Sequence, residues 1–291
     1  MSHHFCTLER EVELEGVGLH SGQSVRLRLL PSSKVGVTFA RVDLPGAPEV
    51  AADVRQVSTT IHATTIESGE ARVSTIEHLL AALWASDYTH VRVELNGPEV
   101  PILDGSSRGW VELLEQAGQR ELTGERPIAR LQAPVWLESK GTQMFGLPLP
   151  IPTDGSETTF RLSVGVNFDA PGAGAQSFDG LISAHSFAHE LASARTFTLE
   201  GWLAPLQAAG LIKGGSLENA ILIGSDGTPS SSLRFENELA RHKALDCVGD
   251  LALALCARGA RFHGHIFALR AGHGAHRDWV NHALASCALT M

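Results

Sequence analysis

Three ionisable residues, His242, Asp246 and Asp250, recur at intervals of four in a stretch of the chain that is otherwise apolar. On an α-helix this spacing places all three side chains on one face. The residues around them suit a buried helix; they are Leu239, Leu245, Val248, Leu251, Leu253 and Leu255. A buried carboxylate costs several kcal/mol unless it is paired or bound to a cation. A histidine and an aspartate one turn apart can supply two ligands of a metal site.

A second interpretation of this stripe is a surface helix whose histidine and aspartates lie in water. Most charged stripes are solvated faces, so the helical pattern alone favours this simpler interpretation. The choice therefore depends on what the rest of the chain brings to the same place.

The composition indicates a globular protein that does not bind nucleic acid. The chain has 291 residues, of which 43% are hydrophobic and 19% charged, enough for one large domain or two of ordinary size. Its net charge is -9 and its pI is about 5.8, whereas a nucleic-acid-binding protein usually has a basic face. A small phosphorylated ligand held by a few local cations stays possible.

The cysteines exclude a disulfide framework and a thiolate zinc site. Cys6, Cys247, Cys256 and Cys287 lie far apart in the sequence, and no two form a CxxC pair. Any metal would therefore need histidine and carboxylate ligands. No export signal is visible at the N-terminus, and the longest apolar stretch, residues 251–257, is too short to span a bilayer. We expect a cytoplasmic protein without an integral membrane segment.

Each half of the chain begins with patterns typical of strands and carries its long helices later. In the first half we predict a hairpin of residues 7–15 and 25–30, a helix at 74–84, a strand at 90–95 and a helix at 109–117. In the second half we predict strands at 128–137 and 159–166, helices at 185–194 and 201–209, a strand at 219–223, a helix at 237–256, a strand at 261–269, a turn at 271–274 and a helix at 276–288. An internal duplication is a reasonable hypothesis, although no strict repeat is visible.

The helix at 74–84 begins with an ambiguous signal. Ser74 and Glu77 fit the capping box S-x-x-E, in which Glu77 would only close the helix start. The neighbouring His78 favours another role, because a Glu-His pair at a helix N-terminus can face a cleft.

Eight segments, taken in order, carry a resemblance that covers nearly the whole chain. They are GVGLHSG at 16–22, STIEH at 74–78, PEVPILDGS at 98–106, ARTF at 194–197, GGS at 214–216, LRFE at 233–236, RHKALD at 241–246 and AGH at 271–273. Each segment alone is weak, but the ordered set is highly specific. The chain resembles the UDP-3-O-acyl-N-acetylglucosamine deacetylases, zinc amidases that commit a sugar nucleotide to lipid A.

This resemblance implies a zinc ion held by His78, His242 and Asp246, with one position left for water. The same donors also suit ferrous iron. The implied reaction is hydrolysis of the 2-acetamido group, with Glu77 as the base that activates water and His273 as the acid that protonates the departing nitrogen.

The family pattern also implies that Asp250 holds His273 and favours its cationic form, and that the Thr196 hydroxyl helps to bind the oxyanion. Taken singly, a solvated loop histidine, a surface aspartate and a capping threonine are the commoner roles for these three residues. The ordered set of segments reverses that preference.

The expected substrate contacts follow from the same resemblance. Lys243 and Arg270 would meet the phosphates of the nucleotide, and Gly215 would lie against the substrate. Phe197 would pack on the sugar face, or be a core residue. The segment 198–230 would form a hydrophobic passage for the acyl chain, with Leu203, Leu206, Leu211 and Ile212 as its lining or as ordinary core.

The architecture that we predict is α+β, with two similar domains, each a mainly antiparallel sheet packed on helices. The first domain would cover residues 1–125 with a small strand insert, and the second would cover 127–291 with the insert at 198–230. The helices of the two domains would face each other, with the site between them. We expect a monomer that acts on a small molecule, an acylated UDP-amino sugar. The alternatives are a related zinc amidase on another acylated amino sugar and a non-catalytic sugar-nucleotide-binding homologue.

Overall fold

The computed structural model describes residues 2–139, 141–151, 158–168, 170–171 and 173–290. The first half of the chain contains β1 (His4–Leu8), β2 (Val12–Val17), β3 (Ser24–Pro31), β4 (Gly36–Arg41), β5 (Glu49–Ala51), η1 (Val54–Gln56), β6 (Val57–Thr59), β7 (Thr65–Ser68), β8 (Ala71–Ser74), α1 (Glu77–Ala85), β9 (His90–Leu95), α2 (Arg108–Ala117) and β10 (Gln119–Glu125). The second half contains β11 (Ile128–Leu131), β12 (Val135–Ser139), β13 (Thr142–Leu147), β14 (Phe160–Asn167), β15 (Ala175–Leu181), α3 (Ala184–Ser186), η2 (Phe187–Leu191), β16 (Phe197–Leu199), α4 (Glu200–Ala208), β17 (Ile221–Ile223), α5 (Glu238–Cys256), β18 (Arg261–Leu269), α6 (His273–Ala285) and β19 (Leu289–Thr290).

The two halves repeat one strand topology. In the first 7-stranded sheet, β9 pairs in parallel with β1 and β4 and antiparallel with β3. In the second 7-stranded sheet, β18 pairs in parallel with β11 and β14 and antiparallel with β13. The outer strands also correspond. In the first sheet β10 pairs with β1, β2 with β3 and β5 with β4. In the second sheet β19 pairs with β11, β12 with β13 and β15 with β14. The predicted α+β class with two similar, mainly antiparallel halves is confirmed.

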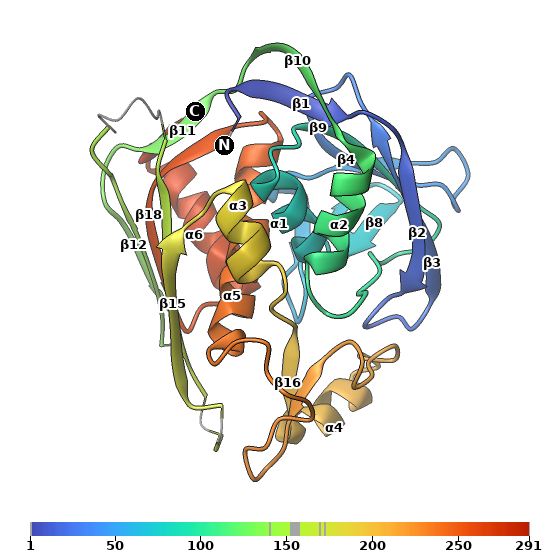
Figure 1. Ribbon diagram of the computed structural model, residues 1–291, viewed down its shortest axis with the longest axis vertical. Coiled ribbons are helices and arrows are strands. Elements are labelled where there is room, and N and C mark those ends of the chain that lie inside the picture. The colour runs from blue at the N-terminus through green and yellow to red at the C-terminus, as the bar shows by residue number, and fades with distance from the viewer. Residues whose placement is uncertain (1, 140, 152–157, 169, 172, 291) are drawn as a thin grey trace.

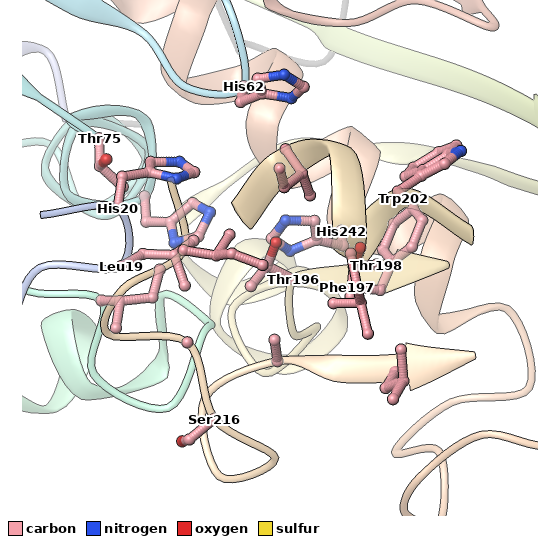
Figure 2. Close-up of a pocket in the computed structure, with 18 of the residues that line it drawn as sticks. Leu19, His20, His62, Thr75, Thr196, Phe197, Thr198, Trp202, Ser216 and His242 are labelled. Carbon is pink, nitrogen blue, oxygen red and sulfur yellow. The ribbon is translucent and has the colours of Figure 1, made fainter. Parts of the chain in front are cut away.

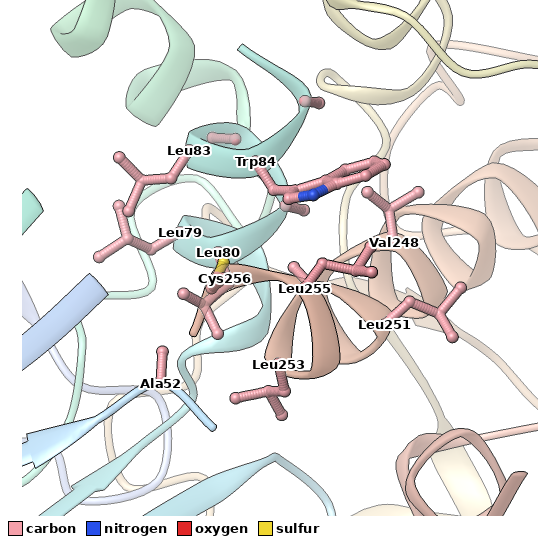
Figure 3. Packing of buried hydrophobic residues seen from close by; sticks show 14 of the residues in the cluster. Ala52, Leu79, Leu80, Leu83, Trp84, Val248, Leu251, Leu253, Leu255 and Cys256 are labelled. Atoms are coloured by element: carbon pink, nitrogen blue, oxygen red, sulfur yellow. The ribbon is translucent and has the colours of Figure 1, made fainter. Parts of the chain in front are cut away.

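Helices α1, α2, α5 and α6 lie between the two sheets, with α1 of the first half against α5 of the second (Figure 1). Leu79, Leu80, Leu83 and Trp84 of α1 and Val248, Leu251 and Leu255 of α5 belong to one buried cluster (Figure 3). Gly249 sits where the two backbones come closest, and a Cβ atom there would lie 2.1 Å from the carbonyl oxygen of Glu77. Only glycine permits this approach, which brings the start of α1 beside the polar face of α5.

Two inserts extend the halves. Strands β6, β7 and β8 form a 3-stranded sheet in the first half. In the second half, β16 and β17 pair in parallel around α4, and this unit projects away from the helical layer (Figure 1). The division into separate domains at residues 125 and 127 stays a prediction, although β10 belongs to the first sheet and β11 to the second.

Arg126, in the link between the halves, ties the ends of α1 and α5 together. Its side chain is 0% exposed and pairs with Asp87, which follows α1. Its Nε donates to the carbonyl oxygen of Gly259 at 2.8 Å, just beyond α5. The link is therefore part of the core between the halves.

We expect Arg126→Leu to lower the free energy of unfolding by about 3–5 kcal/mol, because the buried Asp87 carboxylate would lose its cationic partner. Chemical denaturation measures this loss. The matched control places Arg126→Leu in an Asp87→Asn background, where the loss should be smaller because no charge is left unpaired. Equal losses in both backgrounds would contradict an ionic role for Arg126.

Four local predictions are wrong. The expected strand at 128–137 is two strands, β11 and β12, broken at residues 132–134. The expected strand at 7–15 is two strands, β1 and β2, broken at residues 9–11. The capping box does not form: Ser74 ends β8, Thr75 has a φ of 58°, and α1 starts at Glu77 without a side-chain cap. The predicted turn at 271–274 is shorter, since α6 already begins at His273.

Candidate metal centre and active site

Three side chains from the two halves converge at the α1–α5 contact. His78 is the second residue of α1, while His242 and Asp246 lie one turn apart on α5. The Oδ1 atom of Asp246 lies 3.4 Å from Nε2 of His78 and 3.4 Å from Nε2 of His242. All three residues are buried, with exposures of 5%, 1% and 2%. The interpretation of α5 as a surface helix is therefore wrong.

These three residues fit a divalent cation. The Oδ1 atom of Asp246 is buried yet has no hydrogen-bond partner among the described residues, and an unpaired buried carboxylate oxygen is costly. The Nδ1 atom of His242 lies 3.1 Å from the carbonyl oxygen of Ala194, which leaves Nε2 free to coordinate. Burial lowers the pKa of His242 to about 3, against the opposing effect of Asp246, so the imidazole is neutral as a ligand must be. The other carboxylate oxygen, Oδ2, accepts a hydrogen bond from Lys243 at 2.8 Å.

Glu77 lies directly beside this cluster. Its Oε2 accepts the backbone N–H of Thr64 at 3.1 Å, and its Oε1 lies 3.8 Å from Nε2 of His273. Burial raises the pKa of Glu77, while the positive charge of His273 opposes that shift. A carboxylate with a raised pKa at a buried site is suited to accept a proton from water.

The pKa of His273 is also raised, which for an imidazole favours the charged form. As the first residue of α6, His273 points Nδ1 at Oδ2 of Asp250, 2.8 Å away. Burial alone would lower the pKa of His273, but Asp250 and Glu77 outweigh it and raise the pKa to about 9. The imidazole is therefore protonated at neutral pH, with Nε2 turned toward Glu77.

A cavity of about 390 Å³ connects this polar group to the β16–α4–β17 insert. Figure 2 shows Thr196, Phe197 and His242 around it, with His20 to their left and His62 above them. The backbone of Thr196 is fixed by its N–H bond to the carbonyl oxygen of Gly105 at 2.7 Å and by the N–H of Ile221 at 2.9 Å.

The structure brings most of the predicted substrate residues to this cavity. Lys243, Phe197 and Gly215 line it. The Lys243 ammonium lies 5.6 Å from the centre of the Phe197 ring. Arg270 is exposed and does not line the cavity, so its contact with phosphate stays a prediction. From the insert, Leu203, Leu206 and Ile212 line the cavity and Leu211 does not.

The sequence interpretation missed three residues that shape the site. Gly249 sets the approach of α1 and α5, and a glycine inside an apolar helix is a signal for such packing. His276 contacts Asp250. The predicted last helix starts at His276 and leaves His273 outside it, so the prediction does not show that both histidines face Asp250. Thr64 contacts both Glu77 and Asp250, and no sequence pattern marks it.

Comparison with known proteins identifies the family. Residues 6–285 match the model of the LpxC family, UDP-3-O-acyl N-acetylglycosamine deacetylase. The chain belongs to this family. The UDP-3-O-acyl-N-acetylglucosamine deacetylase of Nostoc sp. is 40% identical over 96% of this chain and 98% of the relative. Those of Chlamydia caviae and Brucella melitensis are 38% and 37% identical, over 92% and 96% of this chain and 92% and 94% of the relatives.

The resemblance drawn from the eight sequence segments is thus confirmed as membership of this deacetylase family. The described residues hold a buried group, His78, His242 and Asp246, that could bind a metal ion. Among the described helices none is long and apolar enough to cross a membrane.

Proposed function

We propose that the protein hydrolyses the 2-acetamido group of UDP-3-O-acyl-N-acetylglucosamine, giving UDP-3-O-acyl-glucosamine and acetate, the committed step of lipid A biosynthesis. The observation that carries this proposal is the buried group of two histidines and an unpaired aspartate oxygen beside the Glu77–His273 pair, at one end of a largely apolar cavity. The polar end suits the amide and the apolar end suits an acyl chain.

His78, His242 and Asp246 would hold the ion, and we propose zinc, with ferrous iron as the alternative for the same donors. When bound, the ion acts as a Lewis acid that polarises the amide and lowers the pKa of water from about 15.7 toward about 7. Three protein ligands are the number found in catalytic zinc sites, which keep a further position for water.

The residues of the chain then supply the proton transfers. Glu77 takes a proton from the attacking water, because its carboxylate lies beside the ligand His78 and is shielded from solvent. His273 gives a proton to the departing nitrogen through Nε2, because its Nδ1 is held by Asp250. The hydroxyl of Thr196 would donate to the oxyanion, a contact typically worth about 3–4 kcal/mol. The nitrogen therefore leaves as a neutral amine, and the proton held by Glu77 passes to His273, which restores both groups. The amine then takes up the proton that the new acetic acid releases, so the products are an ammonium ion and acetate.

The substrate would span the cavity from the metal site to the insert. Lys243 and Arg270 are the proposed cations for the phosphates, and Phe197 and Gly215 are the proposed contacts to the sugar. Leu203, Leu206 and Ile212 would contact the 3-O-acyl chain. We expect the protein to act in the cytoplasm, because nucleotide sugars such as its UDP-linked substrate are made there. We also expect it to act as a monomer, and light scattering measures its oligomeric state.

The test is a deacetylase assay on purified protein with UDP-3-O-acyl-N-acetylglucosamine, run with a chelator and again after adding zinc or ferrous iron. We expect turnover that chelation abolishes and metal restores. Activity only on another acylated amino sugar would favour a related amidase. Binding without any turnover would favour a non-catalytic homologue.

The pH dependence follows from the acid role of His273. Below its pKa of about 9 the imidazole carries the proton that it must deliver, so kcat/KM should fall as the pH rises through that value. A bound cation nearby lowers the pKa of His273, so this fall should begin below pH 9. In His273→Gln the alkaline fall should be absent from the residual activity. An unchanged alkaline limb in that variant would remove His273 from the acid role.

A further inference from the structure

Asp250 has more partners than its role in holding His273 requires. Its Oδ2 accepts hydrogen bonds from Nδ1 of His273 at 2.8 Å and from Nδ1 of His276 at 2.7 Å. Its Oδ1 accepts the hydroxyl of Thr64 at 2.6 Å. These donors come from α6 and from the segment before β7, so both halves of the molecule grip one carboxylate. Asp250 is buried, with an exposure of 3%.

We propose that Thr64 and His276 are positioning residues that fix the Asp250 carboxylate, so that it presents His273 to the departing nitrogen. This inference rests on the proposed deacetylase function. Neither residue touches the reacting atoms, and each acts through Asp250.

The geometry gives the reason. The preferred values of the carboxylate torsion of an aspartate are broad and roughly two-fold, so a single hydrogen-bond partner leaves the group free to rotate about this torsion. With Oδ1 held by Thr64 and Oδ2 shared by two imidazoles, one orientation satisfies all the donors. A catalytic group held in this way loses little entropy on reaching the reactive geometry.

Thr64 also links the proposed acid to the proposed base. Its backbone N–H donates to Oε2 of Glu77 at 3.1 Å, while its hydroxyl donates to Asp250. Thr64 therefore sets the distance between Glu77, the proposed base, and Asp250, which holds the proposed acid. Substitution of the side chain removes only the second contact, because the first belongs to the backbone.

The charged groups around His273 and His276 determine the direction in which the pKa of His273 should change in the variants. His273 faces Glu77 on α1 and Asp246 and Asp250 on α5, and His20 lies within electrostatic range. Burial lowers the pKa of His276, but Cys247 and Asp250 on α5 outweigh this effect and raise the pKa to about 9. The nearby η1 turn contributes Arg55, which pairs with Asp53. Each hydrogen-bond donor partly offsets the negative charge of Asp250. Without one of these donors, Asp250 stabilises the charged form of His273 more strongly, so the pKa of His273 should rise.

The decisive variant is Thr64→Val, which keeps the shape and the backbone contact to Glu77 but loses the hydroxyl. We expect kcat to fall about 10- to 100-fold, the range for loss of a partner that orients a catalytic group, with KM and metal content unchanged. The alkaline limb of the pH profile should move to higher pH. Thr64→Ser, which keeps the hydroxyl, should recover most of the turnover. His276→Phe should act like Thr64→Val, and His276→Asn, which keeps a donor, should be milder.

A second readout separates this inference from the proposed function. NMR titration of the His273 imidazole in the metal-loaded protein needs no turnover, and its pKa should rise in Thr64→Val but not in Thr64→Ser. If the wild type lacks deacetylase activity while this shift occurs, the proposed function fails and the positioning role stands. If Thr64→Val folds with wild-type kcat and an unshifted His273, the positioning role is overturned. Should His276→Phe fail to fold, the Thr64 pair decides alone.

Discussion

Glu77→Gln should lower kcat by about 10²–10⁴-fold, the usual contribution of a general base. The amide has nearly the size of the carboxylate and can still accept the backbone N–H of Thr64, so the local structure should persist. It cannot take a proton from water at neutral pH. His78 and the two proposed ligands on α5 are unchanged, so a metal ion bound by them should be kept. Steady-state kinetics and metal analysis on the same preparation measure both quantities.

The matched control is Glu67→Gln, which removes an exposed carboxylate on β7 that pairs with Arg72. This surface ion pair is worth little, so the control should keep the wild-type rate. A Glu77→Gln variant that stays within a factor of about three of the wild type, small beside the effect expected of a base, would remove Glu77 from that role. A variant that loses both metal and activity would instead make Glu77 a support for the ligand His78.

Helix geometry alone places two of the three proposed metal ligands on one face, and the family resemblance assigns them the role of ligands. His242 and Asp246 share a helix face because the helical repeat fixes their spacing, whatever the rest of the fold does. His78 is different, because it comes from the other half and only its family segment points to it. Its place depends on the approach of α1 to α5 at Gly249, a tertiary contact that no local pattern contains.

The errors at helix starts have local physical causes. Ser74 and Glu77 match a capping box, yet Ser74 is engaged in strand pairing and accepts the N–H of Val100 at 3.0 Å. Thr75 then takes a left-handed conformation and donates its hydroxyl to Glu99 at 2.9 Å, so the chain turns before the helix begins. Tertiary contacts thus override the local capping signal.

The start of α6 was missed for a similar reason. Glycines on both sides of His273 are typical of a turn, but the N–H of His276 bonds the carbonyl oxygen of Gly272 at 3.1 Å and closes the first helical turn. His273 and His276 therefore share one helix face three residues apart. Once α6 is placed correctly, both imidazoles point to Asp250, and the site extends beyond the residues that the family segments mark.

His242→Ala should reduce the bound metal from about one ion per chain to a small fraction of that, because a three-residue site loses a third of its ligands. The side chain is buried between Ala194 and the other ligands, so alanine leaves a polar Asp246 oxygen facing an empty space. Elemental analysis after dialysis against a weak chelator measures the occupancy. His189→Ala, which removes an exposed histidine on η2, is the control and should keep the metal.

The same experiment decides between two candidate clusters. Asp250, His273 and His276 also lie close enough to share an ion, but there the histidine Nδ1 atoms are already hydrogen-bonded to the carboxylate. At the first cluster the Asp246 oxygen between two imidazoles has no such partner. A cation should therefore prefer the first cluster, where it displaces no hydrogen bond between the ligands. Metal retained in His242→Ala but lost in His276→Phe would reverse this assignment, and with it the place where water is activated.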